Sequence, residues 1–175
     1  MNKLSKINIS LLIDLYKSSN FNKLEKKSEE LISLHKDECF LYNMLGVALL
    51  EQQKFNKAIK NFNTAIVIKN DYTEAYFNLG NLYRINNKPE KAISNYLKAI
   101  KINKNYAEAY NNLGLTLKQQ GKIDGAIKNY EKTILINPKL FHAYNNIGNA
   151  LKEKGSFNDA INNIKKAIKI NSNFA

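Results

Sequence analysis

The feature that most constrains this chain is an internal repeat of 34 residues. A block of Tyr, two variable residues, Leu or Ile, and Gly occurs four times, ending at Gly46, Gly80, Gly114 and Gly148. An alanine follows each glycine after 12 residues, and a large apolar or aromatic residue follows after 16. These residues are Ala58, Ala92, Ala126 and Ala160, and then Phe62, Tyr96, Tyr130 and Ile164. A fixed period of this length is typical of stacked supersecondary units that bury their apolar faces against one another.

Each period is expected to hold two amphipathic helices, at about 39–52 and 56–69 in the first full unit. The chain has only two prolines and seven glycines, and it shows no sustained period-2 alternation, so an all-α fold is predicted. Gly121 and Gly155 lie between the two helices of their units and suit the left-handed conformation that ends a helix. Pro89 is placed near the start of a second helix, where its missing N–H costs little.

The glycine inside each first helix needs a separate explanation. Glycine costs about 1 kcal/mol relative to alanine in a helix interior. Its return in every unit predicts a close contact, and we expect a neighbouring backbone to pack against it, with the small residues of the second helix completing the contact.

The pattern resembles the tetratricopeptide repeat. The shared features are the aromatic residue and Leu-Gly pair of the first helix, the alanine and aromatic residue of the second, and a closing proline that is kept only as Pro138. Tyr stands in all four units where the family usually has Trp. The resemblance implies a right-handed αα-superhelical solenoid, a single domain. Its expected parts are a degenerate first repeat or cap at 1–38 and full repeats at 39–72, 73–106, 107–140 and 141–174.

The two ends of the array depart from the pattern. Leu12 takes the place of the glycine in the first unit, so helix packing there is expected to differ. At the other end, the chain stops where a fifth full unit would begin. We expect Ile164, Ile168 and Phe174 to be partly uncovered, which predicts either a natural chain that continues beyond Ala175 or self-association through the C-terminal repeat.

Resemblance to the family also places a binding surface on the first helices, which line the concave face of such solenoids. Asparagine recurs two residues before the glycine and one residue after it, and a basic residue recurs four after it. The candidate partner-binding residues are therefore Asn78, Asn112 and Asn146, then Asn81 and Asn149, then Arg84, Lys118 and Lys152. The asparagine column is similar to the ladder in the repeats of O-linked N-acetylglucosamine transferases.

The chemistry of these residue types suits an extended peptide. Asparagine is a mediocre helix former, but its amide can pair with the N–H and C=O of a peptide backbone. The basic column would favour acidic segments or a free carboxylate. Two other interpretations stay open, because asparagine and lysine are abundant throughout this chain. The asparagine column could reflect composition alone, and the lysines could be ordinary solvated side chains.

Several classes of function have little support. No nucleophile, base and acid occur at catalytic spacing, and His35 with Cys39 supplies only two metal ligands, so we predict no catalytic residue, no metal site and no cofactor. The charge of +12 fits drift in composition better than nucleic-acid binding, because the aromatic residues sit mostly at packing positions. A single cysteine and no recognisable leader or membrane segment predict a cytoplasmic protein without a membrane partner.

Together these observations predict a protein–protein interaction scaffold rather than an enzyme. It would bind an extended peptide or a partner protein, of acidic character, on its concave face. The alternative is the substrate-binding arm of a larger enzyme, such as a glycosyltransferase, whose catalytic part is absent from this chain.

Overall fold

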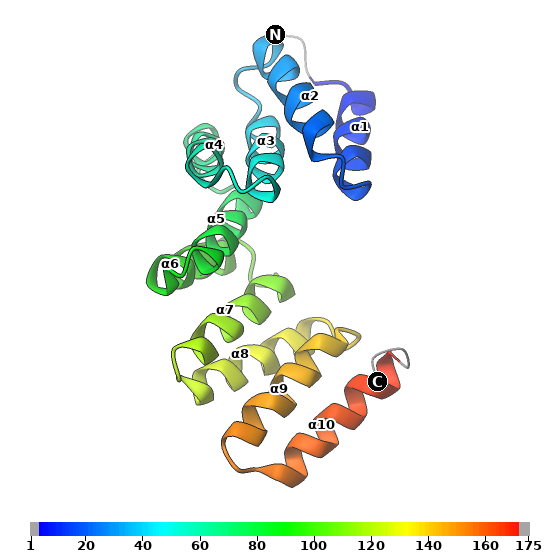
Figure 1. Cartoon of the computed structure of the whole chain (residues 1–175), viewed down its shortest axis with the longest axis vertical. Helices are drawn as coiled ribbons and strands as arrows, with labels where there is room; N and C mark the ends of the chain where they lie inside the picture. The colour runs from blue at the N-terminus through cyan, green and yellow to red at the C-terminus, as the bar shows by residue number, and fades with distance from the viewer. Residues whose placement is uncertain (1–3, 172–175) are drawn as a thin grey trace. The chain divides into compact units, whose positions relative to one another are not determined.

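The computed structural model describes residues 4–171, which hold ten helices and no strand (Figure 1). Each helix has 12 to 14 residues, and neighbours along the chain are joined by short turns. The helices are α1 (Lys6–Lys17), α2 (Phe21–Leu34), α3 (Cys39–Glu51), α4 (Phe55–Ile68), α5 (Thr73–Ile85), α6 (Pro89–Ile102), α7 (Ala107–Gln119), α8 (Ile123–Ile136), α9 (Phe141–Glu153) and α10 (Phe157–Ile170). The predicted all-α fold is confirmed. The helix pair expected at about 39–52 and 56–69 is found as α3, at 39–51, and α4, at 55–68.

The chain divides into two compact units, Met1–Leu82 and Tyr83–Ala175, with the division inside α5. In the first unit α2 packs on both α1 and α3, and α3 packs on α4. In the second unit each helix from α6 to α9 packs on the next one along the chain. Each unit is thus a stack of helical hairpins, in which every inner helix is covered on two sides.

The turns inside the hairpins share one backbone conformation. Gly121 and Gly155 have φ values of 73° and 82°, which confirms the predicted left-handed ends. The equivalent residues of the other hairpins adopt it without glycine, and they are Ser19, Gln53 and Asn87, at φ values of 54°, 59° and 51°. Pro89 is the first residue of α6, as predicted from its missing N–H.

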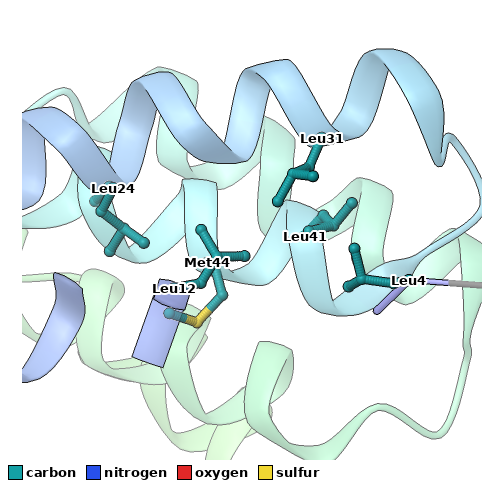
Figure 2. Close-up of a cluster of buried hydrophobic side chains, with 7 residues drawn as sticks. Leu4, Leu12, Leu24, Leu31, Leu41 and Met44 are labelled. Atoms are coloured by element: carbon teal, nitrogen blue, oxygen red, sulfur yellow. The ribbon is translucent and has the colours of Figure 1, made fainter. Parts of the chain in front are cut away.

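Leucines build the core of the first unit. Figure 2 shows Leu12 of α1 beside Met44 of α3, and Leu31 of α2 beside Leu41 of α3, with all four side chains buried. Leu12 occupies the glycine position of the degenerate first hairpin and is fully buried. A leucine therefore stands at the position where Gly46 and Gly114 face a ring of the second helix.

That ring corrects the expectation about the glycines. A Cβ built on Gly114 would lie 2.5 Å from Cε1 of Tyr130, and one built on Gly46 would lie 2.6 Å from Cε1 of Phe62. At these two glycines the nearest atoms belong to an aromatic side chain, so the prediction of backbone packing was wrong. Gly148 agrees in part with the prediction, because a Cβ built on it would meet Ile164 at 2.6 Å and also the backbone oxygen of Ala160 at 3.1 Å.

One face of α10 is uncovered by the part of the chain that the structure describes. Phe157, Ile161 and Ile168 are exposed and Ile164 is half-buried, whereas Phe174 lies outside the described residues. The equivalent face of α8 packs in a cluster with Ile147 and Ala150 of α9. Among the described residues, no helix is long and apolar enough to cross a membrane.

Candidate functional site

The candidate residues occupy the first helices of three hairpins. In the first unit, Asn78 and Asn81 lie on α5. In the second unit the remaining six lie on the end of α5, on α7 and on α9. All are half-buried except Asn149 and Lys152, which are exposed. The first full hairpin carries no equivalent polar site, because its column positions hold Met44, which is buried in the core, and the apolar Leu50.

The asparagine column takes part in hydrogen bonds between neighbouring first helices. Nδ2 of Asn78 donates to Oδ1 of Asn43 at 2.9 Å, and Nδ2 of Asn146 donates to Oδ1 of Asn111 at 3.0 Å. Each pair is separated by 35 residues, one more than the period. The acceptors stand three residues before a glycine and were not among the predicted site residues. The spacing of 35 was the signal in the sequence that could have found them.

Asn112 belongs to a longer network within the second unit. Its Oδ1 accepts a hydrogen bond from Nδ2 of Asn111 at 3.2 Å, and its side chain shares a hydrogen bond with the hydroxyl of Tyr96. Since Asn111 also accepts from Asn146, the network joins α6, α7 and α9. These hydrogen bonds hold the amides of Asn111, Asn112 and Asn146 in defined orientations.

The basic column is not uniform. The guanidinium of Arg84 lies near the hydroxyl of Tyr96, and its Nε is buried without a hydrogen-bond partner. Burial raises the pKa of Tyr96 to about 12, against the lowering effect of the nearby Arg84 charge. Lys118, in contrast, forms an ion pair with Glu153 at 2.9 Å, which the sequence reasoning did not anticipate. The two residues are again 35 positions apart.

The second helices carry a different asparagine column. Nδ2 of Asn61, Asn95, Asn129 and Asn163 donates to the carbonyl oxygen four residues earlier in the same helix, at 2.7 to 2.9 Å. These amides serve their own helix, whereas Asn78 and Asn146 reach the neighbouring one. The two columns consequently differ in role although they have the same composition.

Within residues 4–171, no group of three or more His, Cys, Asp or Glu side chains is arranged to hold a metal ion. Cys39 is a free thiol, and burial raises its pKa above the usual value. A raised pKa lowers the fraction of nucleophilic thiolate at neutral pH.

Comparison with known proteins identifies the repeat. A family model described as TPR repeat matches residues 46–84, 80–121 and 114–155, and one described as tetratricopeptide repeat matches 142–174. A search of curated protein sequences gave no match.

Solved structures agree with this result. A crystal structure of MamA is 27% identical, with a TM-score of 0.81 over 98% of each chain. YrrB, described as a TPR protein with an unusual peptide-binding site, is 19% identical, with a TM-score of 0.72 over 95% of this chain and 86% of its own. PilF of Pseudomonas aeruginosa is 16% identical, with a TM-score of 0.86 over 93% of this chain and 74% of its own. YrrB and PilF support the fold alone, whereas the family models cover most of the sequence, and the chain therefore belongs to the tetratricopeptide repeat family.

Proposed function

We propose that this chain is a protein-interaction scaffold that binds an extended peptide along its first helices. The observation that carries the proposal is the set of amides that bond to a neighbouring helix, Asn78 to Asn43, Asn146 to Asn111 and Asn112 to Tyr96. An asparagine amide has two N–H donors and an acceptor oxygen. At Asn78 and Asn146 the helix contact uses one donor, which leaves one N–H and the oxygen for a peptide backbone.

The spacing of the amides suits an extended ligand. Packed helices lie about 8–10 Å apart, and an extended chain covers about 3.3–3.6 Å per residue. Successive amides within a unit would therefore meet the peptide about every third residue. Because the amides would bind backbone groups, they would not select the side chains of the peptide. Other residues would make that selection, and Arg84 and Lys152 would favour acidic side chains. YrrB, with the same fold, is described as having a peptide-binding site, which supports this proposal.

The proposal is tested by selecting ligands from a displayed library of random peptides and measuring their affinity by fluorescence anisotropy. We expect the combined change Asn78→Ala, Asn112→Ala and Asn146→Ala to weaken binding about tenfold or more, since each lost backbone hydrogen bond is worth about 1 kcal/mol. The matched control is Asn61→Ala, Asn95→Ala and Asn129→Ala, which removes three amides that bond within their own helices. Circular dichroism of both variants verifies that the helices are retained.

Two outcomes would contradict the proposal. One is a library that yields no peptide. The other is equal affinity of the column variant and the control for a selected peptide, which would place the binding surface elsewhere. The alternative role, as the substrate-binding arm of a larger enzyme, uses the same face and predicts that the substrates of that enzyme contain the selected sequence.

The uncovered face of α10 supports a second proposal, self-association through the C-terminal repeat. Phe157, Ile161 and Ile168 are 62%, 50% and 38% exposed. On α1, Ile7 and Leu11 are also exposed, at 80% and 40%, so a second copy offers apolar side chains of matching kind. Sedimentation should show a concentration-dependent dimer or larger species that Ile161→Lys abolishes, and a monomer at every concentration would refute self-association.

A further inference from the structure

A surface hollow in the second unit is lined by polar groups that the fold does not use. It has a volume of about 630 Å³, within the range of small-ligand pockets. Its lining residues are Lys104 and Asn105 of the turn between α6 and α7, Tyr110 of α7, and Lys132, Leu135 and Ile136 of α8. None of them belongs to the asparagine column or the basic column of the first helices, so the hollow is a separate candidate site.

The two lysines of the hollow are not neutralised. In the part of the chain that the structure describes, neither Lys104 nor Lys132 forms an ion pair or donates a hydrogen bond from its ammonium group. Lys154, in contrast, is paired with Asp124 at 2.6 Å. No carboxylate lines the hollow, so the two like charges repel each other, and an anion between them would relieve that repulsion.

Comparison of the hairpins shows that the missing carboxylate is particular to this part of the chain. Asn105 stands where the first two full hairpins have Asp37 and Asp71, and the last has Lys139. Helix stability does not explain Lys132 either. A lysine complements the helix dipole when it lies in the last turn, and the last turn of α8 contains no basic residue.

Two neutral groups complete the set of donors. Tyr110 is half-buried, and its hydroxyl forms no hydrogen bond within residues 4–171 and is not enclosed by the protein. The side-chain amide of the exposed Asn105 forms none there either. A phosphomonoester carries a charge of about −1.5 to −2 and three acceptor oxygens, which suits two ammonium groups and two neutral donors. A carboxylate has one charge and two oxygens, and it would leave one ammonium group without a counter-charge.

We propose that this hollow binds the phosphate of a phosphomonoester. Lys104 and Lys132 would donate the charge-assisted hydrogen bonds, and Asn105 and Tyr110 the neutral ones. Leu135 is 74% exposed and forms an apolar wall of the hollow, where it would contact the carbon atoms that carry the phosphate. This chemistry is common to a phosphoserine side chain and to a small phosphorylated compound.

An adjoining hollow on α8 gives such a ligand room to extend. It has a volume of about 510 Å³ and shares Lys132 and Leu135 with the first. Glu131 lines this second hollow and not the first, and within the described residues it forms no ion pair with Lys132. Adjacent residues of a helix do not face each other, so Glu131 does not take the place of the phosphate.

The test is isothermal titration calorimetry of the full chain in a phosphate-free buffer at physiological ionic strength. The ligands are a capped peptide with one phosphoserine among alanines, its serine and glutamate counterparts, and glycerol 3-phosphate. We expect a phosphorylated ligand to bind about tenfold or more tightly than the serine and glutamate peptides, because it makes more charge-assisted bonds. Binding of the phosphoserine peptide alone would identify a phosphoprotein as the source of the phosphate. Binding of glycerol 3-phosphate would show that the ester itself is sufficient.

Two double variants separate recognition from bulk charge. Lys104→Gln with Lys132→Gln should weaken the phosphorylated ligand about 10- to 100-fold. The matched control, Lys57→Gln with Lys60→Gln, removes the same charge from exposed positions of α4 in the other unit and should change the affinity less than about twofold. Tyr110→Phe keeps the ring and removes the hydroxyl, which should cost about fivefold. Circular dichroism verifies that each variant keeps its helices.

Three results would overturn the inference. They are no binding of either phosphorylated ligand at millimolar concentration, equal affinity for the glutamate and phosphoserine peptides, and equal losses in the two double lysine variants. The proposed peptide binding along the first helices stands or falls separately, because none of its residues lines this hollow.

Discussion

Replacing Gly114 by Ala tests how tightly the hairpins are packed. An added Cβ would lie 2.5 Å from Cε1 and 2.8 Å from Cδ1 of Tyr130. The ring of Tyr130 is fully buried, so it cannot withdraw without moving the helices around it. Overpacking of this kind costs about 1–3 kcal/mol, while alanine gains about 1 kcal/mol over glycine in a helix. We expect a net loss of up to about 2 kcal/mol in the free energy of unfolding.

Gly125 provides the matched control because it lies in α8, and a Cβ there would meet only Cδ1 of Leu117 at 3.5 Å, an ordinary contact. Gly125→Ala should therefore raise stability by about 0.5–1 kcal/mol. Gly148→Ala should fall between the two, because the half-buried Ile164 can change rotamer more readily than a buried ring, although the oxygen of Ala160 remains close.

The assay is urea unfolding followed by circular dichroism, with the slopes compared among the variants before their midpoints are interpreted. The expected order of stability is Gly125→Ala, wild type, Gly148→Ala and Gly114→Ala. If Gly114→Ala were as stabilising as Gly125→Ala, the ring of Tyr130 would not be a rigid neighbour, and the packing explanation of the repeated glycine would be refuted.

Two further predictions concern pH. Burial raises the pKa of Tyr96 from 10 to about 12, so its contribution to stability is fully present below pH 10 and is lost as the pH rises toward 12, by about 3 kcal/mol in all. Between pH 10 and pH 12 the melting temperature should fall less steeply with pH for Tyr96→Phe than for wild type. Equal slopes of melting temperature against pH would contradict the raised pKa of Tyr96. For Glu25, burial alone would raise the pKa, but hydrogen bonds from Lys54 and Gln52, together with the charges of Lys54 and Lys57, outweigh it and lower the pKa below 4.5. That stabilisation is present above pH 4.5 and is lost as the pH falls through the pKa of Glu25 in the folded chain. In thermal melts at acidic pH, the stability of Glu25→Gln should therefore fall less with decreasing pH than that of wild type. An unchanged pH dependence would argue against the bonds to Glu25.

The fold could be predicted because its determinants are periodic. The 34-residue period fixed the helix pairs, and the turn residues at Gly121 and Gly155 identified where the first helix of a hairpin ends. The division of the chain into two compact units had no signal of this kind in the sequence. The repeat boundaries themselves stay a prediction.

The candidate site was predictable only as a set of positions. Which partner each side chain chooses depends on residues that differ between repeats, such as Glu153 beside Lys118. A repeat pattern records what the units share, and it therefore misses pairings that one unit makes and another does not. Arg84 illustrates this limit, since its column was predicted, whereas its position near Tyr96 and its buried Nε follow from one hairpin alone.

The choice between a functional asparagine column and one produced by composition can now be stated in physical terms. Composition alone would place asparagine wherever a polar residue is tolerated, and the column of the second helices fits that description, because each amide there bonds within its own helix. Asn78 and Asn146 instead bond to a neighbouring helix, to asparagines that are themselves inside or near the core. A structural role in joining repeats would explain one donor of each amide, but it leaves the remaining N–H and the carbonyl oxygen unexplained. The comparison of alanine variants in the two columns decides whether those groups bind a peptide, because loss of helix joining alone would lower stability and leave peptide affinity unchanged.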